Sequence, residues 1–185
     1  MLLLIRYYLQ LKITMDFKIN IKDTDIQKIM DIEYGLSNEK LLYTVIERVF
    51  NLKIKHSLFN FSSFDWYDIN YKYLFELKSY RYSYDTYDTT LIGVNKGLTN
   101  NSVFIFKFEP NEIYYIQFNR DLFNTFIKEN IFSRGKYNLC YRIPKHHLIK
   151  IDINNVYELK HNITDYEITK QYIYNDKLNF NKYNK

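Results

Sequence analysis

The spacing of apolar residues changes from a helical to a strand-like pattern near residue 50, and this change constrains the fold most. In SNEKLLYTVIERVF (37–50) the apolar residues recur at the spacing of one helix face: Leu41, Leu42, Val45, Ile46 and Val49. KIKHSLFNF, FDWYD and YKYLFELKSY follow as short runs of the kind found in strands. We therefore expect a helix with Ser37 as its N-cap, then three strands, with a turn near Asp68-Ile69-Asn70 between the last two.

The middle of the chain adds a second hairpin. TTLIGVNKGL (89–98) predicts a short helix or a loop that leads into one. SVFIFKFE and EIYYIQFN then predict two strands that turn at Pro110-Asn111.

The remaining segments complete the expected fold class. RDLFNTFIKENIF (120–132) predicts a second helix, and NLCYRIPKHHLIKI (138–151) predicts one strand and a turn or helix that starts at its proline. Helices and strands in this order predict an α/β protein with a mixed, mostly antiparallel central sheet flanked by helices.

Length and composition indicate a globular protein. The 185 residues fit one domain, and 46% hydrophobic with 25% charged residues is typical of a folded chain. The many tyrosines and lysines and the absence of alanine reflect the codon bias of an AT-rich genome, so they say little about function. The net charge of +5 is compatible with a polyanionic partner such as nucleic acid.

The cysteine content and the termini indicate the cellular context. Cys140 has no cysteine partner, and no Cys/His cluster occurs, which disfavours structural zinc and favours a reducing compartment. The N-terminus lacks a basic region and is interrupted by Arg6, so we expect neither a signal peptide nor a membrane span. We expect an intracellular protein with no membrane partner. Met15 is an alternative start that leaves residues 1–14 as an extension, and residues 174–185 are predicted to be a frayed tail.

A glutamate and a lysine interrupt the apolar run YLFELKSYR (73–81). Successive side chains of a strand point to opposite faces, so Phe75 and Leu77 point one way while Glu76 and Lys78 point the other. The first two can serve the core while the charged pair meets a cleft.

Asp65, in FDWYD, is the predicted neighbour of this pair. If the hairpin turns around Asn70-Tyr71, Asp65 lies across from Glu76, whereas Asp68 is better suited to the turn. Two carboxylates side by side repel each other unless a cation is present, so they favour Mg²⁺. A lysine beside the metal, here Lys78, can orient the attacking water and stabilise negative charge that develops at phosphorus.

An aspartate, then Glu-x-Lys on adjoining strands after a helix that bears a glutamate, resembles the PD-(D/E)XK nuclease superfamily. The matching residues are Glu39, Asp65, Glu76 and Lys78. The resemblance covers residues 35–119, about the size of the family's common core, and implies a restriction-endonuclease-like fold within one domain, 1–185.

The resemblance also implies roles. Asp65, Glu76 and the Leu77 carbonyl would hold one or two Mg²⁺ (or Mn²⁺), with Glu39 contributing directly or through water. Lys78 would position the attacking water. The implied activity is hydrolysis of phosphodiester bonds, in DNA rather than RNA, with 5′-phosphate products.

The stretch ELKSYRYSYDTYDTTLIGVNKG is also similar to a subgroup of uncharacterised viral and phage proteins that run ELKTRR, YPTT and IGxNK. It departs from them at Tyr80, where a basic residue is common, and at Asp88, which replaces a proline. With the AT bias, the similarity implies a large DNA virus or phage and a site of action in the host cytoplasm or nucleus.

Four further residues are candidates for contacts with nucleic acid: Arg81, Thr89, Thr90 and Lys96. The two cations can touch phosphates, with a solvated surface as the alternative. The two threonines can cap a helix that faces the cleft, with capping alone as the alternative.

The tripeptide ELK returns at Glu158-Leu159-Lys160, which shows that it also arises by chance. Only 27 residues follow Glu158, too few to complete such a core, and Asp152 is too close to be its hairpin partner. We therefore take this copy to be surface. Two alternatives to a nuclease stay open, a nuclease-like module that binds nucleic acid without cleaving it and a viral structural or host-interaction protein.

Overall fold

The computed structural model describes residues 23–58, 62–96, 98–133 and 136–183. Its contacts divide the chain into two compact units, residues 1–34 and residues 35–185. The single nuclease-like domain, with its core at 35–119, stays a prediction. The extension predicted at residues 1–14 lies outside the described residues.

The first described element is helix α2 (Asp23–Val49), which contains the predicted helix and starts well before it. The prediction of Ser37 as N-cap is therefore wrong, because Ser37 is an interior residue of α2. A single Gly or Ser costs a helix interior only about 1 kcal/mol, too little to start or stop it. Within the second unit, Leu42, Ile46 and Val49 are at most 2% exposed, which confirms these residues of the predicted apolar face, whereas Leu41 is 59% exposed.

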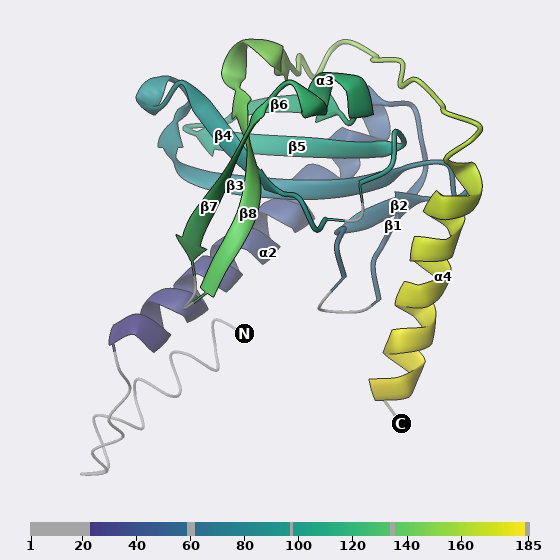
Figure 1. Ribbon diagram of the computed structural model, residues 1–185, viewed down its shortest axis with the longest axis horizontal. Coiled ribbons are helices and arrows are strands. Elements are labelled where there is room, and N and C mark those ends of the chain that lie inside the picture. Colours follow the sequence, from purple (N-terminus) through teal and green to yellow (C-terminus); the bar gives the residue numbers. More distant parts are fainter. Residues whose placement is uncertain (1–22, 59–61, 97, 134–135, 184–185) are drawn as a thin grey trace. The chain divides into compact units, whose positions relative to one another are not determined.

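Six strands form the central sheet, in the order β1-β2-β3-β5-β6-β9 (Figure 1). Their bounds are β1 Ile54–His56, β2 Trp66–Asp68, β3 Leu74–Ser83, β5 Ser102–Glu109, β6 Glu112–Gln117 and β9 Ile149–Lys150. In the described part of the chain, β3 and β5 pair in parallel, and the other neighbours in this sheet pair antiparallel. The prediction of an α/β fold with a mixed, mostly antiparallel central sheet is confirmed.

Both predicted hairpins of this sheet are present. The β5–β6 pair turns at Pro110-Asn111. The β2–β3 turn is held by Asp68, whose carboxylate accepts hydrogen bonds from the backbone N–H groups of Asn70, Lys72 and Tyr73 at 3.0, 2.6 and 2.6 Å. An aspartate that accepts from the N–H groups of its own turn is a common way to close one.

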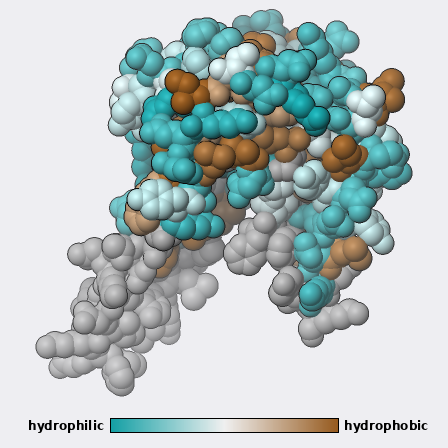
Figure 2. Space-filling view, viewed as in Figure 1, coloured by the Kyte–Doolittle hydropathy of each residue, from teal (hydrophilic) through white to brown (hydrophobic). Residues whose placement is uncertain are grey.

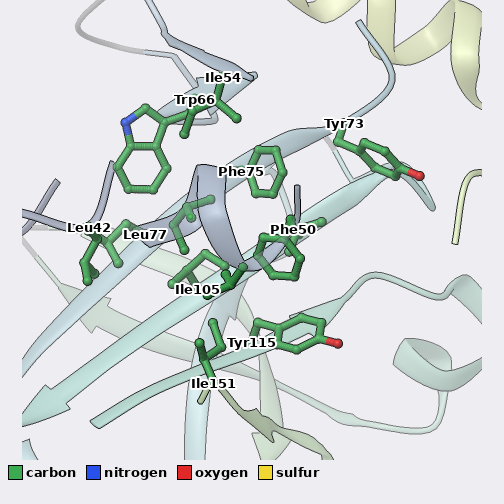
Figure 3. Close-up of a cluster of buried hydrophobic side chains, with 13 residues drawn as sticks. Leu42, Phe50, Ile54, Trp66, Tyr73, Phe75, Leu77, Ile105, Tyr115 and Ile151 are labelled. Atoms are coloured by element: carbon green, nitrogen blue, oxygen red, sulfur yellow. The ribbon is translucent and has the colours of Figure 1, made fainter. Parts of the chain in front are cut away.

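Apolar side chains bury both faces of the sheet. On one face Phe75 and Ile105, both 0% exposed, pack with Leu42 of α2 in one core cluster (Figure 3). On the other face, β5 contributes Phe104 and Phe106 to a second cluster. A strand buried on both faces reads as a continuous apolar run, which explains SVFIFKFE. In Figure 2 hydrophilic residues cover most of the face shown, with hydrophobic ones gathered in a band across its middle.

Three further strands form a second sheet in the order β4-β8-β7, with bounds β4 Thr89–Gly93, β8 Lys136–Pro144 and β7 Ile127–Ser133. The helix or loop predicted for TTLIGVNKGL is therefore wrong over Thr89–Gly93, and a turn follows. Its Thr-Thr-Leu-Ile start is β-branched and alternates, with Thr90 and Ile92 buried at 2% and 0% exposure, which suits a strand.

The long helix predicted for RDLFNTFIKENIF is also wrong beyond its first turn. Helix α3 (Arg120–Asn124) starts where the Asn119 side chain accepts from the Leu122 N–H, and ends at Thr125, whose N–H bonds to the Leu122 carbonyl. The rest is β7, which pairs with β8 over seven residues. Pairing with a distant strand outweighs the local helical pattern here.

The C-terminal segments match the predictions in part. A strand followed by a turn that starts at the proline is confirmed by β8 and the 3₁₀ turn η2 (Lys145–His147), and a similar turn, η1 (Tyr84–Thr86), follows β3. The frayed tail predicted at 174–185 is instead helical through Tyr183, as part of α4 (Tyr166–Tyr183). Ile173 of α4 is 0% exposed and packs on Tyr67 and Leu74, so burial holds the helix in place. No helix in the described residues is long and apolar enough to cross a membrane.

Candidate active site

Strand β3 presents Glu76 and Lys78 on the face opposite to Phe75 and Leu77, as the alternation predicts. Phe75 and Leu77 are 0% and 8% exposed and belong to the core cluster under α2. The Glu76 carboxylate is also nearly buried, with a side-chain exposure of 6%. A buried carboxylate needs a partner of opposite charge or a bound cation to offset the loss of hydration.

The hairpin brings Asp65 to the pair in the predicted register. Trp66 pairs with Phe75, which places Asp65, one residue earlier, across from Glu76. The Asp65 N–H donates to the Phe75 carbonyl at 2.8 Å, and its Oδ2 accepts from the Leu77 N–H at 2.6 Å. The Asp65 carboxylate therefore lies against the backbone between Glu76 and Lys78, the segment that carries the Leu77 carbonyl.

Two lysines converge on one oxygen of Glu76. Oε1 lies 2.5 Å from Lys78 Nζ and 2.7 Å from Lys96 Nζ. The other oxygen, Oε2, is buried and has no hydrogen-bond partner among the residues that the structure describes. A cavity of about 10 Å³ lies beside Glu76, with Lys96 and Phe104 also in its lining. That is roughly the space of one water molecule or one small ion.

The acidic side chains of the site perturb one another. Burial and the nearby charge of Glu76 raise the pKa of Asp65 to about 8, although the Leu77 N–H and Lys78 act in the opposite direction. Burial and Glu76 also raise the pKa of Glu39, which projects half-buried from α2. Burial would lower the pKa of Lys78, but Glu76 and Asp65 outweigh it, and the pKa is raised. Three acidic groups thus lie close together, and burial with the nearby charge of Glu76 favours the protonated forms of Asp65 and Glu39.

Of the four residues predicted to contact nucleic acid, one reaches the site and the other three lie elsewhere on β3 and β4. Lys96 reaches the site through its ion pair with Glu76. Arg81 is exposed on β3. The prediction that Thr89 and Thr90 cap a helix is wrong, because both lie in β4. Thr89 accepts from Arg142 at 3.1 Å, and the buried Thr90 hydroxyl lies 2.8 Å from that of Tyr80.

The second sheet adds neighbours that the sequence did not predict. Burial raises the pKa of the Cys140 thiol on β8, and the nearby charge of Lys78 acts in the opposite direction. The Tyr80 ring is half-buried on the same side of β3 as Lys78. No sequence signal could have indicated these contacts, because they depend on how β4 and β8 pack on β3.

The remaining acidic candidates lie outside the site. Asp68 is 0% exposed and occupied by its turn. Glu158 and Lys160 of the second ELK are exposed in the irregular segment before α4, which supports the prediction that this copy is surface.

The fit of a divalent metal depends on Glu76 and Asp65. Across the residues that the structure describes, no group of three or more His, Cys, Asp or Glu side chains is placed to hold a metal ion. The unpartnered Glu76 Oε2 lies beside a small cavity, and the Asp65 carboxylate, across the hairpin from Glu76, is a second hard oxygen donor. With the Leu77 carbonyl they fit the ligand preference of Mg²⁺, which binds one or two carboxylates and keeps several waters.

Comparisons with protein-family models, with curated proteins and with solved structures found no match to this chain.

Proposed function

We propose that this protein is a metal-dependent nuclease of the PD-(D/E)XK type that hydrolyses phosphodiester bonds, in DNA rather than RNA. The observation that carries the proposal is the register of the β2–β3 hairpin. It sets Asp65 against the backbone of Glu76-Leu77-Lys78, with a buried and unpartnered oxygen on Glu76. The sequence pattern alone could arise by chance, but the convergence of these groups in space is a more demanding condition.

Each residue has a distinct role in this proposal. Asp65, Glu76 and the Leu77 carbonyl would hold Mg²⁺ or Mn²⁺, with Glu39 contributing from α2. The bound metal would supply Lewis-acid stabilisation of the scissile phosphate. Lys78, held at 2.5 Å from Glu76 Oε1, would orient the attacking water and stabilise negative charge in the transition state.

Lys96 would contact the phosphate rather than the water. Its Nζ shares Glu76 Oε1 with Lys78, yet it comes from the turn after β4 and not from the sheet. A lysine on a turn can exchange a carboxylate for a phosphate at little cost, since both are anionic oxygen acceptors. We propose that the protein acts inside the host cell of a virus or phage, without a membrane partner.

A second function, nucleic-acid binding without cleavage, is favoured by one observation. Both lysines pair with Glu76 in the structure, so its charge is already balanced without a metal. In that case the site would bind phosphates through the same lysines but lack activity. A viral structural or host-interaction role, the third alternative, has no specific observation in its favour.

Crystals soaked in Mn²⁺ would separate the two functions. We expect anomalous density between residues 65 and 76, together with Mg²⁺- or Mn²⁺-dependent cleavage of DNA. The matched control is Glu76→Gln, which keeps the size of the side chain and removes its charge, and it should lose both. Absence of the Mn²⁺ peak, together with nucleic-acid binding but no cleavage of single- or double-stranded DNA or RNA, would replace the nuclease by the binding module.

A further inference from the structure

The distal parts of β7 and β8 form a ribbon that is only two strands wide. The last residue of β4, Gly93, pairs with Cys140, and one further backbone bond joins Val94 to Leu139. Beyond it, among the described residues, β7 and β8 pair only with each other, as far as Ser133 and Lys136. We call residues 130–133 and 136–139 the arm. Figure 1 shows β7 and β8 running together away from the central sheet.

The arm exposes large side chains that a solvated hairpin does not need. Phe132 and Tyr137 are 63% and 73% exposed, pair directly across the ladder and have ring centroids 5.1 Å apart. Leu139 is 43% exposed on the same face, and Asn130 lies opposite it. Exposed aromatic residues next to amide side chains are typical of a surface that contacts a partner.

The charges at the arm are mostly positive. Lys136 at its tip and Lys128 at its base are exposed, and they lie on opposite faces of the ribbon. The nearest acid, Glu129, accepts a hydrogen bond from Arg142 Nε at 2.8 Å, so its charge is balanced. Net positive charge on both faces suits a partner with anionic surfaces on two sides.

The base of the arm adjoins the candidate active site. Cys140 is the first residue of β8 after the arm, and it interacts electrostatically with Lys78. Beside it, the hydrogen bond between the Tyr80 and Thr90 hydroxyls joins β3 to β4. All of these residues belong to one compact unit, 35–185. From Cys140 to Lys136 the strand extends over about 13 Å, at about 3.3 Å per residue.

We propose that the arm enters the major groove of duplex DNA whose scissile phosphate lies at Lys78; this inference rests on the proposed function. A two-stranded ribbon fits the major groove of B-form DNA, and the aromatic face can contact thymine methyl groups there. Lys128 and Lys136, on opposite faces, can each approach one of the two phosphate backbones that border the groove. The major groove of duplex RNA is too deep and narrow for such a ribbon, so the substrate is duplex DNA.

Binding of a fluorescent 20-base-pair duplex in Ca²⁺, without cleavage, tests the proposal. Lys128→Ala/Lys136→Ala should weaken binding about tenfold or more and reduce the slope of log K against log salt by about 2. The matched control, Lys160→Ala/Lys170→Ala, removes the same charge from exposed positions elsewhere and should leave the affinity within about twofold. Phe132→Ala/Tyr137→Ala, which keeps all charges, should weaken binding of duplex DNA about fivefold and leave duplex RNA unchanged.

Several outcomes would overturn the inference. The arm variants could bind duplex DNA as wild type does, the control could lose as much affinity as the lysine pair, or duplex RNA could bind as tightly as duplex DNA. A change from dimer to monomer in sedimentation for the aromatic variant would assign the arm to a second copy of this chain. The binding measurement does not require cleavage. If wild type cuts DNA and the arm variants bind duplex DNA with unchanged affinity, only this inference is wrong and the proposed function stands. Failure of wild type to bind any nucleic acid would remove the proposed function as well.

Discussion

The two carboxylate oxygens of Glu76 have different surroundings. Its Oε1 is balanced by two ammonium groups, whereas Oε2 is buried without a partner. A buried acceptor left without a hydrogen bond costs about 1 to 3 kcal/mol. Such a cost is common where a site is built for a ligand rather than for stability.

Lys78 is the residue that separates catalysis from binding. Lys78→Ala should lower the rate of cleavage by about 10²-fold or more, because its charge acts mainly in the transition state. Lys78→Met, which keeps the stem, should behave like alanine. DNA affinity in Ca²⁺ should fall only by about one phosphate contact. Equal losses in affinity and rate would show that Lys78 acts in binding alone.

Asp65 and Asp68 should differ in the kind of damage that their loss causes. Asp65→Ala should abolish Mg²⁺-dependent cleavage while the protein stays folded. Asp68→Ala should lower the free energy of unfolding by about 2 kcal/mol or more, since it leaves three backbone N–H groups without their acceptor, and that of Tyr73 is buried. Cleavage assays and urea unfolding of both variants measure the loss of activity and the loss of stability separately. Full activity of Asp65→Ala with loss in Asp68→Ala at native stability would reverse the assignment.

The raised pKa of Asp65 predicts how stability depends on pH without metal. Between its unfolded pKa near 3.8 and its folded pKa of about 8, the folded state holds a proton that the unfolded state releases. Stability therefore falls as pH rises through this window. Asp65→Asn lacks this slope, so in a chelator its stability advantage should grow from pH 4 to pH 8, reach about 1 kcal/mol or more, and then level off. Parallel pH profiles for the two proteins would contradict the shift.

At the scale of elements, the two ELK copies show that context decides what a motif can do. Glu76-Leu77-Lys78 is part of a ten-residue strand with neighbours on both sides, whereas Glu158-Leu159-Lys160 lies in an irregular segment. A strand fixes the direction of each side chain through its ladder, and an irregular segment leaves charged ends in solvent.

The second copy should accordingly be dispensable. Glu158→Ala/Lys160→Ala should leave cleavage and metal binding within about twofold, since exposed substitutions cost under about 0.5 kcal/mol. The matched variant is Glu76→Ala/Lys78→Ala, which should abolish activity. Complete loss of activity in the first variant, with its circular dichroism unchanged, would move the site to the C-terminal segment.

At the scale of the whole molecule, α4 stabilises the hairpin that carries the site. Ile173 packs on Tyr67 of β2 and Leu74 of β3, and Asp176 accepts from the Ser57 hydroxyl and the Leu58 N–H at 2.7 and 2.9 Å. These contacts join segments that are about a hundred residues or more apart in the chain.

Ile173→Ala should therefore lower the free energy of unfolding by about 2 to 4 kcal/mol, as expected for a fully buried aliphatic side chain. Tyr174→Ala, one position on and 60% exposed, serves as the control and should change it by about 0.5 kcal/mol or less. Urea unfolding measures both. Similar values for the two variants would mean that α4 frays in solution, as its polar sequence alone suggests.

The sequence by itself determined five strands of the central sheet and the register of the β2–β3 hairpin, but not the parallel pairing of β3 with β5. Apolar runs such as SVFIFKFE, the alternation around Glu76 and the turn at Asp68 are local patterns, and each residue's neighbours along the chain are enough to specify them. The placement of Asp65 across from Glu76 followed from the length of that turn.

Only the tertiary structure decided the second sheet, the start of α2 and the place of α4. Thr89–Gly93 and Ile127–Ser133 became strands because β8 pairs with both, and the β4–β8 pairing joins segments far apart in the chain. For the same reason, the ion pair of Lys96 with Glu76 and the position of Cys140 near Lys78 could not be predicted. Long-range pairing and burial exceed the few tenths of a kcal/mol by which local preferences differ, so they override the local pattern wherever the two disagree.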